Sequence, residues 1–198
     1  MTVVYFVRHA HSPWLPNQEA TRPLSQEGHA AARAVAASLS DRPPAAIYAS
    51  PYERAVQTVE PIAADHGLDI ELVPEFRERT LTDGPAENIG ETFESAIDAV
   101  WSDWTVSWPG GESNWEAQAR GVTALERILD AHPDDHVVVG THGNLLTLIL
   151  NHYDDRFDFA FWRDELRTPD CLRAVFEDGV LATTERIDTA SPTDRRTT

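Results

Sequence analysis

The 198-residue sequence contains no lysine, and its sixteen basic residues are all arginine. They are outnumbered by 33 aspartate and glutamate residues, which gives a formal net charge of -17 at pH 7. This excess of negative charge argues against nucleic acids and anionic membranes as partners, because both require a basic face. The acidic, lysine-free composition favours adaptation to high salt, although a GC-rich genome that prefers arginine codons would produce the same bias.

Cysteine and long apolar runs are also scarce. The single cysteine, Cys171, excludes a disulfide framework. No segment approaches the ~20 apolar residues that a membrane-spanning helix needs. Met1 leads directly into a strand-like segment, without the basic region and apolar core of a signal peptide. These absences predict a cytoplasmic protein without membrane association.

The hydrophobic pattern alternates between strand and helix periodicity along most of the chain. Strands are expected at residues 3–7, 45–49, 70–73 and 137–140, with a closing hairpin at 172–176 and 180–184; helices are expected at 25–39, 51–64, 92–104, 114–131 and 143–150. This alternation predicts an α/β protein, a three-layer α/β/α sandwich with a mainly parallel sheet. We expect one domain over residues 1–187 and a flexible C-terminal tail at 188–198.

Two of the expected strands end in chemically similar residues. Residues 3–7 run into Arg8 and His9, and residues 137–140 run into His142 and a helix. In parallel sheets the ligand site lies beyond the carboxyl ends of the strands, so these side chains are expected at one edge. The helix that follows His142 would direct its free N–H groups and its positive dipole end toward the same place.

A third strand, at 45–49, leads into the segment "SPYERAVQT". Ser50 is expected to be the N-cap of the next helix, with Pro51 at its first position and Glu53 completing a capping box. This arrangement places Arg54 in the opening turn, at the same edge as Arg8 and the two histidines. Two guanidinium groups and two imidazoles together suit a phosphate group.

Six segments occur in a characteristic order: "VRHAHSPW", "RPLSQEG", "YASPYERAVQT", "FRER", "GGES" and "VVVGTHGN". With this set the chain resembles, over residues 3 to 150, the histidine phosphatase or phosphoglycerate mutase-like superfamily, branch 1 type. Each motif alone is weak, but the combination is specific. The resemblance implies a phosphoglycerate mutase-like fold with a small helical cap, inserted at roughly 74–113.

The resemblance also implies roles for individual residues. His9 would form a covalent phosphohistidine, which splits one difficult hydrolysis into two displacements. Arg8, Arg54 and a protonated His142 would hold the phosphoryl oxygens, so that neither a metal nor a cofactor is expected. Glu78 would protonate the leaving alkoxide and then deprotonate the water that releases phosphate.

The segment from His9 to the helix expected at 25–39, here called the nucleophile loop, departs from the family pattern at two positions. Ala10 stands where the glycine after the nucleophilic histidine is usual. Ser12 matches the hydroxyl residue and is a further phosphate-binding candidate. Leu15 stands where family members often carry asparagine, and Asn17 is a candidate replacement. With Trp14, these loop residues are candidates for substrate contact.

Residues 80–119 contain no basic residue, but they carry eight carboxylates and four tryptophans. A mutase must retain a bisphosphorylated intermediate, and it resembles a cationic cage with extra basic residues in the cap. An acidic, aromatic cap is poorly suited to hold such an anion. The composition favours a hydrolase whose monoester has an apolar or neutral leaving group, with a mutase-type phosphotransferase as the alternative. The tryptophans suit the core of the cap, a substrate surface or a homodimer interface.

Other interpretations of the site residues remain open at this stage. Glu78 lies among charged neighbours at 75, 77 and 79, so a solvated charge cluster is an alternative to a catalytic role. Glu112 and Ser113 either begin a helix, with Ser113 as its cap, or contact the phosphate site. A protein that binds phosphorylated ligands without turnover is a further alternative, but it would be expected to lack His9 or Glu78.

A metal site is not expected. His9 and His11 would share a strand face, but Pro13 breaks the strand and no matching cluster of ligands accompanies them. The partner implied by these residues is a small phosphorylated substrate. Sugar phosphates, nucleotides, small phosphoesters and phosphohistidine on another protein all remain candidates.

Overall fold

The computed structural model describes residues 1–84, 90 and 92–189. The strands are β1 (Thr2–Arg8), β2 (Ala46–Ala49), β3 (Ile70–Leu72), β4 (His136–Thr141), β5 (Asp170–Glu177) and β6 (Val180–Arg186). The helices are α1 (Gln26–Ser38), α2 (Glu53–His66), α3 (Phe93–Ser102), α4 (Asn114–Ala131) and α5 (Gly143–Tyr153), with short turns η1 (Pro74–Phe76) and η3 (Phe161–Glu165).

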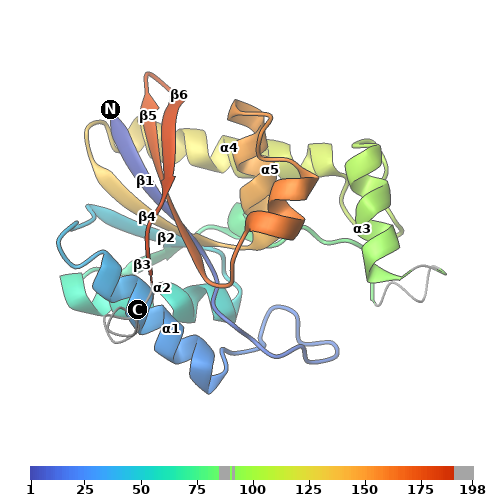
Figure 1. Ribbon diagram of the computed structural model, residues 1–198, viewed down its shortest axis with the longest axis horizontal. Coiled ribbons are helices and arrows are strands. Elements are labelled where there is room, and N and C mark those ends of the chain that lie inside the picture. Colours follow the sequence, from blue (N-terminus) through green and yellow to red (C-terminus); the bar gives the residue numbers. More distant parts are fainter. Residues whose placement is uncertain (85–89, 91, 190–198) are drawn as a thin grey trace, which may run out of the picture.

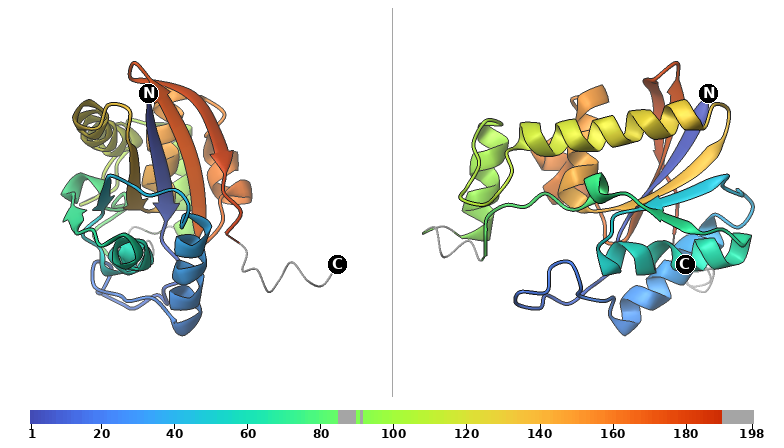
Figure 2. Two further views of the ribbon diagram at one scale, coloured as in Figure 1. Left: turned by 90° about the vertical axis from the view of Figure 1, so that its left-hand side faces the viewer. Right: turned by 180° about the vertical axis from the view of Figure 1, so that it is seen from behind.

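The six strands form one sheet in the order β3-β2-β4-β1-β5-β6. The first four of these run parallel, β5 pairs antiparallel with β1, and β6 pairs antiparallel with β5. Helices α1 and α2 pack on one face of the sheet, and α4 and α5 pack on the other (Figures 1 and 2). The predicted α/β fold with a mainly parallel sheet is therefore confirmed.

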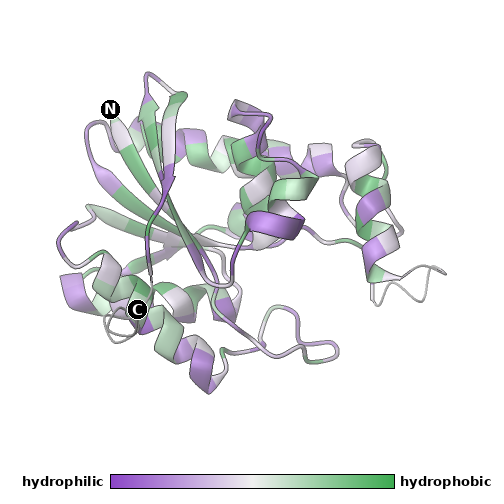
Figure 3. Ribbon diagram, in the orientation of Figure 1, coloured by the Kyte–Doolittle hydropathy of each residue, from purple (hydrophilic) through white to green (hydrophobic). Residues whose placement is uncertain are grey.

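The central strand β1 shows why both faces are covered. Val4 and Phe6 belong to the apolar cluster beneath α4 and α5, whereas Val3, Tyr5 and Val7 belong to the cluster beneath α1 and α2. Successive strand side chains point to opposite faces, so a strand buried on both faces must be apolar throughout. The inner strands are accordingly the green, hydrophobic part of the sheet in Figure 3.

The hairpin predicted near the C-terminus is present. Asp178 and Gly179 connect β5 to β6, with φ values of 50° and 79°. Two central residues with positive φ form the turn that matches the right-handed twist of paired strands, and an Asp-Gly pair adopts it readily.

Helix α3 stands away from the sheet, beside the first turns of α4 (Figure 1). The tryptophans hold it there, since Trp104 contacts Trp101 and Trp115 with ring centroids 5.6 Å and 5.3 Å apart. Trp108 adds a hydrogen bond from its indole N–H to the Ala96 carbonyl. Residues 85–89 and 91, which belong to the cap expected at 74–113, lie outside the described residues. Most of the expected C-terminal tail, from residue 190, also lies outside them. The boundaries of the cap and of the tail stay predictions.

The start of α2 differs from the sequence prediction. The helix begins at Glu53 after Tyr52, and no side chain caps it. Ser50 instead lies 2.8 Å from Nε2 of the buried His142, and the Glu53 N–H donates to the Ala20 carbonyl. The predicted Ser50 cap and capping box are wrong, because the Ser50 hydroxyl and the Glu53 N–H both form hydrogen bonds with residues outside the helix.

No helix within the described ranges is both long and apolar enough to cross a membrane.

The contact between α4 and α5 depends on Gly121. A Cβ atom there would lie 2.8 Å from Cγ1 and 2.9 Å from Cδ1 of Ile149. We expect Gly121→Ala to lower the free energy of unfolding by about 1–3 kcal/mol, because overpacking outweighs alanine's helix propensity of ~1 kcal/mol. Urea unfolding measures this value. The reverse change at exposed Ala119, Ala119→Gly, reports propensity alone, and a stabilised Gly121→Ala variant would show that the contact is loose.

Candidate active site

The candidate site is built where β1 and β4 end. The two strands pair in a register that sets Arg8 opposite Thr141, and the next backbone N–H, that of His9, donates to the Thr141 carbonyl at 3.0 Å. Likewise, the N–H of Ser50, the residue after β2, donates to the Gly140 carbonyl near the end of β4 at 2.8 Å. The His9 and His142 rings consequently lie edge to face, with centroids 5.2 Å apart.

His9 is oriented by the residue that follows it. Its Nδ1–H donates to the Ala10 carbonyl at 2.8 Å, which leaves the Nε2 lone pair available. The Ala10 N–H in turn donates to the Thr58 hydroxyl. The Ala10 methyl group is fully buried beside Leu24 and Ala32, so the loop accommodates it. Burial, reinforced by the positive charge of Arg54, lowers the pKa of His9 to about 3, so the ring is neutral at pH 7.

Arg8 is anchored at one end of its guanidinium group. Its NH1 donates to the carbonyls of Leu166 and Arg167, each at 3.1 Å. Its Nε is buried and has no hydrogen-bond partner within the described part of the chain. A Cβ at Gly143 would lie 3.0 Å from Nε and Cζ of Arg8, so glycine lets the start of α5 approach this side chain.

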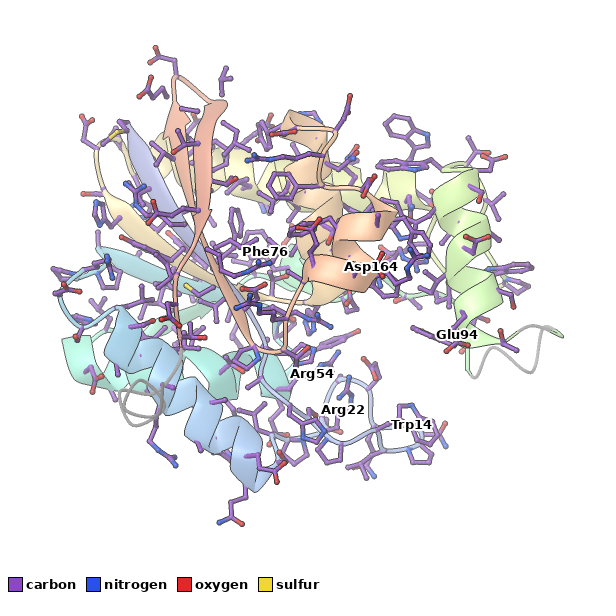
Figure 4. All side chains as sticks on the ribbon, viewed as in Figure 1. Trp14, Arg22, Arg54, Phe76, Glu94 and Asp164 are labelled. Carbon is purple, nitrogen blue, oxygen red and sulfur yellow. The ribbon has the colours of Figure 1, made fainter. Side chains whose placement is uncertain are left out.

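Arg54 is almost completely buried and is held by the nucleophile loop. Its NH2 donates to the Glu19 carboxylate at 2.5 Å and its NH1 donates to the Glu19 carbonyl, while its Nε has no partner among the described residues. Arg22 also donates to the Glu19 carboxylate, at 3.1 Å, and lies beside Arg54 (Figure 4). The Tyr52 ring lies under the Arg54 guanidinium, 5.0 Å from its Cζ.

His142 is fully buried at the start of α5. Its Nε2 lies 2.8 Å from the Ser50 hydroxyl oxygen, and that oxygen accepts from the Tyr52 N–H. Its Nδ1 has no partner in the described ranges. Burial, followed by the charge of Arg54, lowers its pKa well below the usual value. His142 is therefore neutral at pH 7 in the ligand-free protein. The protonated form expected from the sequence concerns the site with a phosphoryl group bound, and it stays a prediction.

Glu78 lies against the same helix terminus. Its carboxylate accepts from the backbone N–H groups of Asn144 and Leu145, at 3.2 and 3.0 Å, and from that of Arg79 at 2.9 Å. An anion at a helix N-terminus is stabilised by the free N–H groups and the dipole. The side-chain oxygen of Asn144 accepts a hydrogen bond from the indole N–H of Trp101 in α3, which connects α3 to the start of α5.

Glu112 and Ser113 serve the scaffold in this structure. The Ser113 hydroxyl caps α4 in a capping box with Glu116. The Glu112 carboxylate accepts from Arg77, from Arg120 and from the Thr80 N–H. Of the two interpretations left open by the sequence, the structure shows the helix start. Glu112 thereby braces the segment that carries Glu78.

The other substrate-contact candidates lie in the nucleophile loop, and within the described chain none of them forms a hydrogen bond with the ring of His9 or His142. The Ser12 hydroxyl donates to the Pro23 carbonyl at 2.8 Å. Trp14 is 70% exposed at the outer part of the loop (Figure 4). Leu15 is partly buried, and Asn17 is exposed in a turn with φ of 58°. Their contacts with substrate stay predictions.

Several residues of the site were missed in the sequence. Ser50 was assigned to a helix cap, although its place between a strand end and Arg54 was a signal for a site residue. Thr58 follows Arg54 by one helical turn, and its hydroxyl donates back to the Arg54 carbonyl. Arg22 opens the motif "RPLSQEG" but was given no role at the site, and Glu19 carried no signal because its loop has no periodicity.

No group of three or more histidine, cysteine, aspartate or glutamate side chains in the described ranges is placed to hold a metal ion. The residues that converge here instead offer nitrogen donors. Nε of Arg8, Nε of Arg54 and Nδ1 of His142 are all buried and unpartnered within the described ranges. Such an arrangement can bind a phosphoryl group through charge-assisted hydrogen bonds, next to a neutral imidazole nucleophile.

Comparison with known proteins gives a consistent family. Residues 4–186 match the model of the histidine phosphatase superfamily (branch 1). The chain is 32% identical over 154 residues to phosphoglycerate mutase-like protein 4 of Arabidopsis thaliana, covering 72% of this chain and 67% of that protein.

Two solved structures show the same fold. Phosphoserine phosphatase of Entamoeba histolytica superposes with a TM-score of 0.77 at 20% identity, covering 96% of this chain and 98% of that one. Mycobacterial glucosyl-3-phosphoglycerate phosphatase superposes with a TM-score of 0.73 at 22% identity, covering 96% and 99%. These two likenesses show the fold, and the family match over residues 4–186 indicates phosphatase or phosphotransferase chemistry.

Acid should destabilise this protein through the two histidines of the site. Both are neutral when folded, whereas an unfolded chain's histidine has a pKa of about 6.5. As pH falls below that value the unfolded chain takes up protons that the folded chain does not, so the free energy of unfolding decreases.

We expect His9→Gln to reduce this decrease, between pH 6.5 and 4.5, by about 1 kcal/mol per pH unit. Urea unfolding at several pH values measures it. His152→Gln, at an exposed position, is the matched control and should retain the wild-type slope. Equal slopes for wild type and His9→Gln would contradict the prediction.

Proposed function

Because the chain belongs to branch 1 of the histidine phosphatase superfamily, we propose that it hydrolyses a small phosphomonoester through a phosphohistidine on His9, without a metal ion. The observation that carries this proposal is the set of unpartnered buried nitrogens around that ring, on Arg8, Arg54 and His142. Buried polar groups are normally hydrogen-bonded, so three such groups around one nucleophile favour an anionic ligand.

In the first step, Nε2 of His9 attacks phosphorus while the bond to the ester oxygen breaks. The Nδ1–H bond to the Ala10 carbonyl holds the ring in the required tautomer and supports the positive charge that develops on it. Arg8 and Arg54 donate to the equatorial oxygens. His142 donates from Nδ1 when the Ser50 hydroxyl donates to its Nε2, so a neutral His142 suffices.

Glu78 would transfer the protons. In its protonated form it gives a proton to the leaving oxygen; it then accepts a proton from the water that attacks the phosphohistidine and breaks the P–N bond. This role is supported by the position of Glu78 at the start of α5, since the helix that begins after His142 also donates to the Glu78 carboxylate. Phosphate and the free alcohol are the products.

The surroundings of the site favour hydrolysis over a mutase reaction. Residues 80–119 contain no arginine or lysine and carry eight carboxylates. A bisphosphorylated intermediate would have to remain bound beneath this acidic segment, which repels it. Water, in contrast, is not repelled. A mutase would need priming by a bisphosphate, so a phosphate-release rate that a bisphosphorylated primer leaves unchanged supports the hydrolase.

The direct test is phosphate release from an aryl phosphate, measured in low and high salt with excess chelator. We expect chelator-resistant turnover that falls at least a thousandfold in His9→Ala, since the nucleophile is lost. His152→Ala, at an exposed position on α5, is the matched control and should retain full activity. Turnover that survives in His9→Ala would overturn the proposed mechanism.

The role of Glu78 can be tested separately. We expect Glu78→Gln to slow hydrolysis of an alkyl phosphate by ~10² to 10⁴-fold, because its leaving group needs a proton. With a nitrophenyl phosphate, whose leaving group does not, an initial burst of nitrophenol should precede a slow release of phosphate. Acid-labile phosphate on the protein during this phase would identify the phosphohistidine. Equal losses on both substrates, without a burst, would mean that Glu78 only supports the fold.

A further inference from the structure

Arg8 is held by a part of the chain that lies beyond the family motifs, which end at Asn144. The carbonyls of Leu166 and Arg167 accept from its NH1, each at 3.1 Å. Both residues lie in the segment 165–170, here called the anchor segment, which connects η3 to β5 past the carboxyl end of β1 (Figure 1). Residues 166–169 belong to neither a helix nor a strand, so secondary structure does not fix the two carbonyls.

Asp170 ties the anchor segment to the sheet. It is the first residue of β5 and stands opposite Arg8 in the antiparallel register of β1 and β5. Its carboxylate, 2% exposed, accepts from the N–H of Arg167 at 3.0 Å and from that of Cys171 at 3.1 Å. The Leu166 carbonyl and the Arg167 N–H belong to one planar peptide unit. By holding that N–H, Asp170 therefore fixes the direction of a carbonyl that holds Arg8.

Arg186, the last residue of β6, completes this network. Its Nε donates to both oxygens of the Asp170 carboxylate, at 2.9 and 3.0 Å, and its NH2 donates to the Glu165 carbonyl at 3.0 Å. One rigid, planar guanidinium group therefore joins the two ends of the anchor segment, residues 165 and 170. It also neutralises the buried Asp170 carboxylate, while its own side chain is 27% exposed.

The hairpin that carries both residues has other support. Strands β5 and β6 pair in an antiparallel ladder, and the Ile187 N–H donates to the Cys171 carbonyl at 2.8 Å. These backbone bonds involve neither side chain of the pair. The Arg186 guanidinium instead reaches beyond the ladder to the anchor segment, so its contacts serve the position of that segment.

We infer that Asp170 and Arg186 are positioning residues for Arg8. They fix the carbonyls that hold its NH1, which leaves the buried, unpartnered Nε free to donate to a phosphoryl oxygen. The inference rests on the proposed function, which makes Arg8 a phosphate ligand. Asp170 also acts through its charge: burial lowers the pKa of Arg8, and the Glu78 and Asp170 carboxylates oppose this effect.

The order of the Arg8 side chain is the first test, and it needs no substrate. In the magnetic resonance spectrum of nitrogen-labelled, ligand-free protein, the Nε–H signal of Arg8 is identified by its loss in Arg8→Lys, and its exchange with water is measured. We expect Arg186→Gln to speed this exchange about tenfold, the size of effect typical within one hydrogen-bond network. Arg156→Gln removes an exposed arginine that also contacts β6, and this matched control should keep the wild-type rate.

Titration calorimetry with inorganic phosphate tests whether Arg186 acts through Arg8. We expect Arg186→Gln to raise the Kd about tenfold in the wild-type background and less than about twofold in Arg8→Lys. Equal losses in the two backgrounds would mean that Arg186 only supports the fold, and would contradict the positioning role. Asp170→Asn should give the same pattern and is the second variant if Arg186→Gln does not fold, since the charge that it leaves unpaired is partly exposed.

The exchange measurement separates this inference from the proposed function, because it decides even for a protein without turnover. Faster exchange at Arg8 in Arg186→Gln, in a protein that hydrolyses no aryl phosphate, would support the positioning pair and contradict the hydrolase. Turnover that depends on His9, together with an unchanged Arg8 signal in Arg186→Gln and Asp170→Asn, would support the hydrolase and overturn the pair.

Discussion

The parallel pairing of β1 with β4 is the constraint on which the rest of the site depends. The register that sets Arg8 opposite Thr141 also sends His9 and His142 out of the sheet side by side. Because strand side chains alternate between faces, a slip of one residue would exchange the side chains that β1 packs into the two apolar clusters, and it would separate the two rings. The packing of the core and the geometry of the site are therefore determined by the same hydrogen-bond ladder.

The start of α5 brings together the remaining residues of the candidate site. His142 precedes the helix, Gly143 lets it approach Arg8, and the next two backbone N–H groups hold Glu78. One helix terminus thus follows His142 and lies against both the Arg8 guanidinium and the Glu78 carboxylate. Helix α3 reaches the same point through the hydrogen bond from the Trp101 indole N–H to the Asn144 side chain, so the region expected to form the cap is joined to the start of α5.

Much of the fold was predictable because it follows from local patterns. The strands and helices were expected within a few residues of their observed positions, since periods of 2 and 3.6 persist along buried faces. The start of α2 was mispredicted because the Ser50 hydroxyl, a good helix cap by local rules, is taken by His142, a residue 92 positions away. The lowered pKa of the ligand-free His142 had no sign in the sequence, since its burial next to Arg54 follows from tertiary packing.

The sequence by itself determined the layers of the fold, the family, and the presence of Arg8, His9, Arg54 and His142 at strand ends, because these follow from hydrophobic periodicity and short motifs. Only the tertiary structure decided which donors remain free. It directs Nδ1 of His9 to a carbonyl, joins Arg54 to Glu19, and anchors Arg8 on the segment before β5. Hydrogen bonds between distant segments, and the loss of solvent around them, are properties of the packed chain and have no local pattern from which to predict them.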